Sequence, residues 1–145
     1  MNEGLVFAQF GLLATLGVQV YNRWPNIRFD NLSAGLLTLG IVLTIWTLMS
    51  NRVGNFRIVP EPKEGGQLIT HGPYRYIRHP MYTCLLLFAV TAVMIIDGWW
   101  AWFNWFSLLL VLVFKAVIEE GYLKKHYGSY AQYMKNTKRF VPWLI

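Results

Sequence analysis

The sequence has few charged residues. Asp, Glu, Lys and Arg make up 14% of its 145 residues, whereas a soluble domain has about 25%. Four long stretches contain none of them: residues 4–22, 31–51, 80–96 and 98–114. Because a helix needs about 20 apolar residues to cross a bilayer, this pattern argues against a soluble domain. It predicts an all-α integral membrane protein with about four transmembrane helices.

Cysteine is almost absent, and internal repeats are lacking. The one cysteine, Cys84, excludes an internal disulfide and a cysteine-based metal cluster, so no metal site is predicted. Residues 1–145 are predicted to form a single domain. Its helices are expected at about residues 5–21, 32–50, 80–96 and 100–126, and a C-terminal cytoplasmic segment is expected at 127–145.

Basic residues are scarce in two of the predicted loops and frequent elsewhere. Residues 52–78 hold five Lys or Arg and the chain from Lys115 onward holds six, whereas the first connection holds two and the third turn none. Cytoplasmic loops of membrane proteins carry the excess of Lys and Arg, so both termini are predicted to be cytoplasmic. Topology and anionic lipid headgroups account for the net charge of +6, and no nucleic-acid partner is predicted.

The stretch from Gly65 to Cys84, GGQLITHGPYRYIRHPMYTC, combines rigid, aromatic and basic residues directly before an apolar run. Proline is favoured at the first position of a helix, so His79 should precede a helix that begins at Pro80. The free N–H groups of Met81 and Tyr82 would then form an anion-binding helix end. An equally open interpretation is that His79 only caps the helix, while Arg75 and Arg78 contact lipid phosphates.

Two adjacent carboxylates, Glu119 and Glu120, lie at the predicted cytoplasmic end of the last helix. Helical spacing puts Lys115, Glu119 and Tyr122 on one face and turns Glu120 about 100° away. One interpretation is a surface Lys–Glu pair at i,i+4 spacing. The other is a carboxylate that accepts hydrogen bonds from the two hydroxyls of a ribose.

The two segments together resemble a known family. The runs LITHGPYRYIRHPMY and EEGYLKKHYGSYAQYMKNTKRFVPWLI are similar to the isoprenylcysteine carboxyl methyltransferase and phospholipid methyltransferase superfamily of integral membrane enzymes. The typical patterns are G-x-Y-x-x-x-R-H-P-x-Y, then E-E-x-x-L-x-x-x-[FY]-G-x-x-Y-x-x-Y, a basic stretch and a proline. The matching residues are Gly72, Tyr74, Arg78, His79, Pro80, Tyr82, Glu119, Glu120, Leu123, Tyr127, Gly128, Tyr130, Tyr133, Arg139 and Pro142.

The resemblance implies S-adenosylmethionine as cofactor, in a cytoplasmic pocket formed by the loop before the third helix and the C-terminal segment. It implies methyl transfer to a lipophilic acceptor, such as a prenylcysteine carboxylate or a lipid, which enters from the bilayer. Lys115 takes the substrate-side position, where the family often has arginine, and Glu120 or His126 would serve as a base for an acceptor that needs one. The implied cofactor contacts are Gly66, Gln67, Leu68, Ile69, Tyr74, His79, Pro80, Met81, Tyr82 and Glu119.

Two other functions remain open on sequence grounds. Membrane sterol reductases that use NADPH share a similar R-H-P-x-Y segment and an acidic, aromatic C-terminal tail. A membrane protein that keeps the fold without turnover would also carry these motifs.

Overall fold

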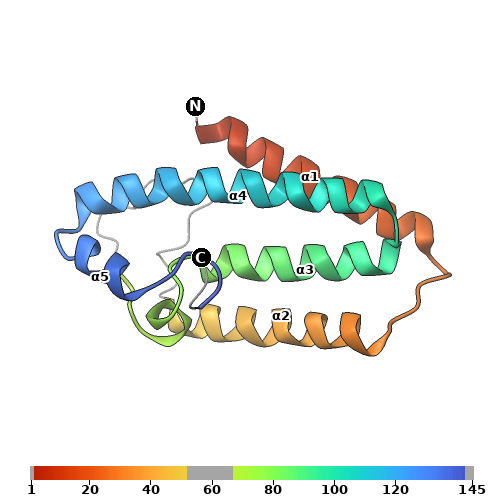
Figure 1. Ribbon diagram of the computed structural model, residues 1–145, viewed down its shortest axis with the longest axis horizontal. Helices are drawn as coiled ribbons and strands as arrows, with labels where there is room; N and C mark the ends of the chain where they lie inside the picture. The colour runs from red at the N-terminus through yellow and green to blue at the C-terminus, as the bar shows by residue number, and fades with distance from the viewer. Residues whose placement is uncertain (1, 52–66, 143–145) are drawn as a thin grey trace.

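The computed structural model describes residues 2–51 and 67–142, and the named elements within these ranges are all helices (Figure 1). Four long helices form the body: α1 (Asn2–Arg23), α2 (Asn31–Ser50), α3 (Pro80–Ile96) and α4 (Trp99–His126). A 3-10 turn, η1 (Gly72–Arg75), precedes α3, and a short helix, α5 (Tyr130–Asn136), follows α4.

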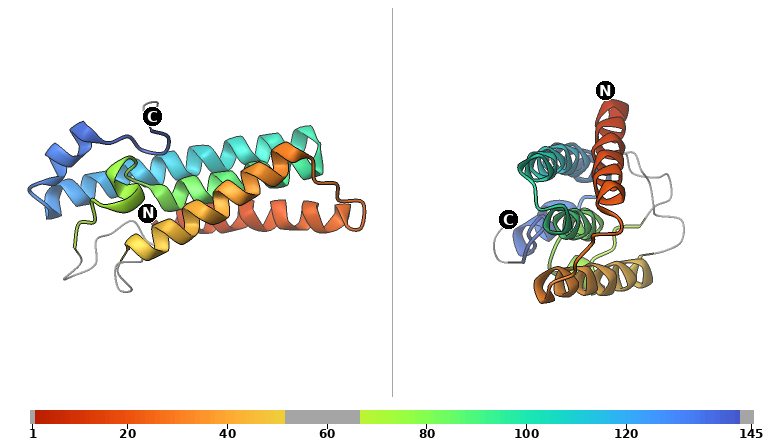
Figure 2. Two further views of the ribbon diagram at one scale, coloured as in Figure 1. Left: turned by 90° about the horizontal axis from the view of Figure 1, so that it is seen from below. Right: turned by 90° about the vertical axis from the view of Figure 1, so that its right-hand side faces the viewer.

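The helices form a bundle in which α3 packs between α2 and α4, and α1 packs against α4 and α3 (Figures 1 and 2). The core consists of small and aliphatic side chains on the inner faces, including Leu16, Ala89, Val93, Leu108 and Leu112. The connections α1–α2 and α3–α4 lie at one end of the bundle, while η1 and α5 lie at the other (Figure 1). The order of the elements therefore brings the segment before α3 and the segment after α4 together.

The outer faces of the bundle are apolar. Large side chains such as Phe7, Leu39, Ile45 and Phe103 are about half exposed or more, which is what a lipid-facing surface requires. Three helices, α1, α2 and α4, are long and apolar enough to cross a membrane, and α3 is a shorter apolar helix of 17 residues. The chain is a multi-pass integral membrane protein.

The four predicted long helices agree with the observed ones to within three residues at each end. The third helix has the predicted bounds, but at about 1.5 Å per residue it falls short of the roughly 30 Å thickness of a bilayer core. Pro80 fixes its start, and Asp97, with a φ of 49°, ends it in a left-handed turn. The sequence interpretation also missed α5, which is only seven residues long and too short to give a periodic signal.

Gly72, at the start of η1, packs against the end of α2. Its φ is +61°, a conformation that side chains rarely adopt, and a Cβ there would overlap the side chain of Ser50. Farther along α2, Gly40 lies against the ring of Phe88 on α3, 3.0 Å from an added Cβ. The absence of a side chain at these two glycines allows α2 to lie close to η1 and to α3.

Candidate functional site

The imidazole of His79 lies between the two adjacent carboxylates of α4. Nδ1 is 3.5 Å from Glu119 Oε2 and Nε2 is 3.4 Å from Glu120 Oε1. The imidazole also stacks on the ring of Tyr82, with centroids 5.2 Å apart and planes 3° from parallel. His79 is buried, and its Nε2 makes no hydrogen bond within the part of the chain that the structure describes. The structure thus brings the two predicted halves of the site together.

The helix end at His79 is more occupied than predicted. The backbone N–H of Tyr82 is not free but donates to the carbonyl of His79 at 3.0 Å. The His79 side chain makes no capping hydrogen bond either. Because both imidazole nitrogens face carboxylates, His79 neither caps α3 through its side chain nor presents an open anion site.

Glu119 is the more accessible of the two carboxylates, with 31% of its side chain exposed. Its Oε2 accepts a hydrogen bond of 2.9 Å from the hydroxyl of Tyr82. The sequence predicted that Glu119 shares a face with Lys115, and both do turn toward Tyr82, since Lys115 Nζ lies 5.4 Å from the centre of the Tyr82 ring. Tyr82 therefore links α3 to two successive turns of α4.

Glu120 is buried and bound by two guanidinium groups. Arg78 Nε donates to Oε1 at 2.8 Å, and Arg139 Nη2 donates to Oε2 at 2.9 Å. Arg139 Nε contacts both oxygens, at 3.1 and 3.2 Å. Both oxygens are engaged, so the contacts of Glu120 support a structural role more than a role as a base. The alternative that Arg78 meets lipid phosphates is not seen, because its side chain is only 8% exposed.

Residues 137–140, which we call the C-terminal strap, lie along the segment that leads into α3. Arg78 N donates to Lys138 O at 2.7 Å, His79 N donates to Arg139 O at 3.0 Å, and Lys138 N donates to Tyr76 O at 3.2 Å. Arg78 Nη1 donates to the carbonyl of Thr137 at the start of the strap. At the other end of the strap, the Phe140 ring packs against His79 and Tyr82.

Lys115 is buried in the interface between α1 and α4. Its Nζ donates to Oε1 of Gln9, which is also buried, at 2.5 Å. Sequence reasoning missed Gln9, because a lone glutamine in an apolar helix carries no local signal of a partner 106 positions away.

The remaining predicted cofactor residues differ in how far they are buried. Gly66 lies outside the described residues, Gln67 is exposed, Leu68 is half-buried and Ile69 is buried. Tyr74 lies in η1, where its carbonyl accepts from the hydroxyl of Tyr133 at 2.6 Å and its own hydroxyl accepts from Asn51. Pro80 is buried and Met81 half-buried at the start of α3.

Burial and charge shift the pKa of two predicted site residues outside the four long helices. Burial lowers the pKa of His79, but its contacts with Glu119 and Glu120 outweigh that effect, so the net pKa is raised. Burial and the nearby charge of Glu119 raise the pKa of Tyr74 to about 12. The two carboxylates therefore favour the charged form of the imidazole, and the Tyr74 phenol stays protonated at neutral pH.

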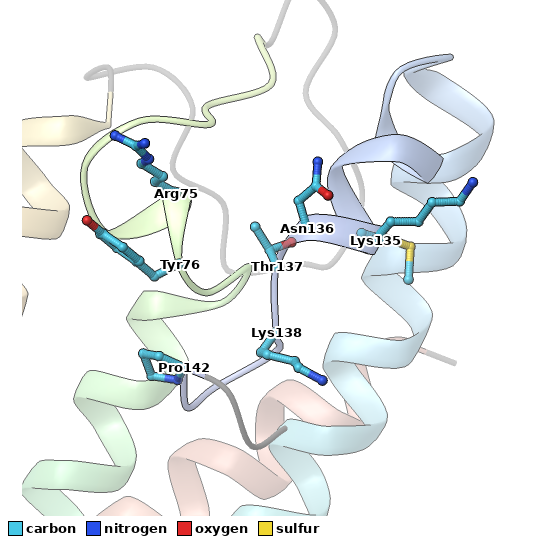
Figure 3. Close-up of a pocket in the computed structure, with 8 residues that line it drawn as sticks. Arg75, Tyr76, Lys135, Asn136, Thr137, Lys138 and Pro142 are labelled. Carbon is cyan, nitrogen blue, oxygen red and sulfur yellow. The ribbon is translucent and has the colours of Figure 1, made fainter.

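A surface pocket of about 200 Å³ lies beyond the strap, between Arg75–Tyr76 and the end of α5 (Figure 3). None of the predicted cofactor residues lines it. The side chains of Arg75 and Lys135 point away from one another there (Figure 3), so its cations do not converge on one point. This pocket is separate from the His79 cluster.

The fold and the site define a multi-pass helical membrane protein with a buried cluster of paired carboxylates, imidazole and guanidinium groups at one end. The chain belongs to the phospholipid methyltransferase family, whose model matches residues 31–130. That range begins with α2 and includes His79, Arg78 and both carboxylates, but it leaves out α1, most of α5 and Arg139.

Two named proteins are similar to this chain. The cobalt-zinc-cadmium resistance protein CzcN of Cupriavidus metallidurans is 32% identical, over 86% of this chain and 56% of that protein. The protein-S-isoprenylcysteine O-methyltransferase of Schizosaccharomyces pombe is 36% identical, over 52% of this chain and 33% of that protein. The chain thus spans between one third and somewhat over half of the length of these relatives. The predicted resemblance to the superfamily is confirmed.

Proposed function

We propose that the protein transfers a methyl group from S-adenosylmethionine to a lipophilic acceptor at the cytoplasmic face of the membrane. The observation that supports this most is the meeting of Glu119, Tyr82 and His79 at one end of the bundle. These residues come from the two segments that carry the family resemblance, on helices joined by a short turn at the opposite end.

The residues of the cluster suit this cofactor. When bound, S-adenosylmethionine supplies an electrophilic methyl group on a sulfonium. Glu119, one-third exposed, would accept hydrogen bonds from the ribose hydroxyls or the amino group. His79 Nε2 is a buried polar atom without a hydrogen bond among the described residues, and the rings of Tyr82 and Phe140 offer apolar faces beside it. We also propose contacts from residues 66–69, Tyr74, Pro80 and Met81.

The geometry changes the roles proposed for His79 and Glu120. His79 holds Glu119 in place through Nδ1, so it orients the accepting carboxylate and does not itself face a cofactor carboxylate. Glu120 holds Arg78 and Arg139 and thereby fixes the C-terminal strap, which excludes water from the cluster. Positioning and water exclusion are the main contributions that methyl transfer needs from a protein.

Lys115 is proposed to lie on the acceptor side, one helical turn from Glu119 toward the centre of the membrane. A carboxylate acceptor would need no base and would be attracted by the ammonium group. An amine acceptor would need to lose a proton, and with Glu120 engaged by two arginines, His126 at the exposed end of α4 is the remaining candidate base of those predicted.

We propose that all four long helices cross the membrane, with both termini in the cytoplasm. Although α3 is short, it packs between α2 and α4, and snorkelling flanking residues or local thinning compensates for a short span. The side chains of Arg78 and Lys115 are buried and are therefore left out of the charge count. Nine other Lys or Arg residues lie on the proposed cytoplasmic side and two on the other, which supports the same orientation.

Incubation of the purified protein with methyl-labelled S-adenosylmethionine and native lipid extract tests the activity. We expect label in a chloroform-soluble product, and none with the Glu119→Gln variant. Carboxyl methyl esters release methanol in mild base whereas N-methylated lipids do not, so base treatment identifies the acceptor group. Reduction of a lipid double bond with NADPH, without label transfer, would contradict the proposal in favour of a reductase.

The name of the Cupriavidus metallidurans relative refers to metal resistance, but metal binding is not proposed for this chain. No group of three or more His, Cys, Asp or Glu side chains is placed to hold a metal ion within residues 2–51 and 67–142.

A further inference from the structure

We infer that Gln9 of α1 is a positioning residue for Lys115, which makes α1 part of the acceptor side of the site. This inference rests on the proposed methyl transfer. It starts from the 2.5 Å hydrogen bond between Lys115 Nζ and Gln9 Oε1, both in side chains that are at most 6% exposed.

A buried ammonium group must have polar partners, because transfer of a charge into an apolar interior is costly. The Gln9 amide provides one such partner without neutralising the charge, as a carboxylate would. Hydrogen bonds to a charged group are also stronger than those between neutral groups, so Gln9 can determine the direction in which the flexible lysine side chain points.

The direction that Gln9 selects leads to the cluster. Lys115 Nζ lies over the face of Tyr82 at 5.4 Å from the ring centre, and the Tyr82 hydroxyl binds Glu119. A continuous series of contacts thus runs from Gln9 on α1, through Lys115 on α4 and Tyr82 on α3, to Glu119. Loss of the Gln9 amide would remove this hydrogen bond between α1 and the ammonium group that lies over the ring.

A second polar contact between α1 and α4 provides a control. It shows whether Gln9 acts by positioning Lys115 or only by holding the two helices together. Asn104 on α4 donates to the hydroxyl of Thr15 on α1. It lies 11 positions from Lys115 and, among the described residues, makes no hydrogen bond to the cluster. Replacement of Asn104 by leucine removes this α1–α4 hydrogen bond but leaves Lys115 unchanged. It is the matched control for Gln9→Leu.

The test compares Gln9→Leu, Gln9→Asn, Gln9→Glu and Asn104→Leu in methyl transfer to N-acetyl-S-farnesyl-L-cysteine, phosphatidylethanolamine vesicles or native lipid extract, whichever the wild type methylates. We expect Gln9→Leu to lower kcat/KM for the acceptor by about 10-fold or more, with the affinity for S-adenosylhomocysteine changed less than 2-fold. Gln9→Asn, one methylene shorter, should fall between, and Asn104→Leu should stay within about 3-fold of wild type. Gln9→Glu keeps a hydrogen-bond acceptor for Lys115 but neutralises the ammonium charge, so it should also lower kcat/KM for the acceptor. Equal losses in Gln9→Leu and Asn104→Leu would overturn the inference.

A measurement that does not depend on enzyme activity tests the role of Gln9 separately from the proposed methyl transfer. The Nζ resonance of Lys115 in ¹⁵N-lysine-labelled protein, assigned by its absence in Lys115→Met, should shift or broaden in Gln9→Leu and not in Asn104→Leu. An unchanged resonance in Gln9→Leu, or in Gln9→Asn if the leucine variant does not fold, would overturn the positioning role. A wild type that methylates none of the acceptors would contradict the proposed function, while the resonance would still report on the contact.

Discussion

Arg139 Nη2 donates to Glu120 Oε2 at 2.9 Å, and this ion pair ties the C-terminal strap to α4. The Glu120 side chain is 3% exposed, whereas that of Arg139 is 31% exposed, so the carboxylate is the buried anchor and the arginine closes over it. Arg78, on the segment that leads into α3, binds the same carboxylate. One side chain therefore joins three parts of the chain.

Glu120→Gln should destabilise the protein by about 3 kcal/mol and release the strap. Removal of one partner from a buried ion pair leaves an uncompensated charge, at a cost of about 3–5 kcal/mol, and the partial exposure of Arg139 places this case at the low end. Thermal unfolding in detergent measures the loss. Limited trypsin digestion measures release of the strap, because the backbone at Lys138 and Arg139 would lose its hydrogen bonds to residues 76–79 and could enter the protease.

Glu119→Gln is the matched control for Glu120→Gln. Its carboxylate contacts Tyr82 and His79 but neither arginine, so the strap should stay resistant to trypsin. Equal digestion of the two variants would contradict the assignment of Glu120 as the anchor.

Gly72→Ala should lower the free energy of unfolding by about 2 kcal/mol or more. The left-handed conformation costs a non-glycine residue about 1–2 kcal/mol, and the added methyl group would overlap Ser50. Gly121→Ala is the control, because Gly121 lies within α4 with nothing within 4 Å of an added Cβ. Alanine is favoured over glycine in a helix by about 1 kcal/mol, so the control should be neutral or stabilising. A neutral Gly72→Ala would contradict the close approach of η1 to α2.

The stability of the wild type should fall as the pH rises above about 6.5, the ordinary pKa of histidine. The folded-state pKa of His79 is raised by Glu119 and Glu120. Its ion pairs therefore contribute fully below the unfolded-state pKa, and this contribution is lost as the pH rises through the folded-state pKa. Unfolding measured between pH 6 and 9 should show this slope in the wild type and a flatter profile in His79→Gln. Parallel profiles would contradict a charged His79.

The sequence was sufficient to predict the long helices, because long charge-free runs bounded by proline, glycine and charged residues are strong signals. It also predicted that the His79 segment and Glu119 meet, since a short turn between two helices makes their far ends neighbours. The bounds of α3 were predicted, but hydropathy gives no sharp limit that decides whether a 17-residue helix crosses the membrane. The existence of α5 was not predicted, because a short helix depends on its tertiary contacts.

The partners of the charged residues could not be predicted from spacing alone. Glu120 looked like a candidate base because only its helical direction was known, and its two arginine partners come from distant segments that fold against it. Gln9 was missed for the same reason. The basic residues near the membrane were assigned to topology, yet Arg78 and Lys115 are buried.

The central claim is that Glu119 and His79 form part of a site for S-adenosylmethionine. Calorimetric titration of the purified protein with S-adenosylhomocysteine tests it most directly, with NADPH as the competing ligand and His79→Ala and Glu119→Gln as variants. We predict that the wild type binds S-adenosylhomocysteine and not NADPH, and that both variants lose at least about 10-fold in affinity, or about 1.4 kcal/mol. Wild-type affinity in both variants, or binding of NADPH alone, would contradict the claim.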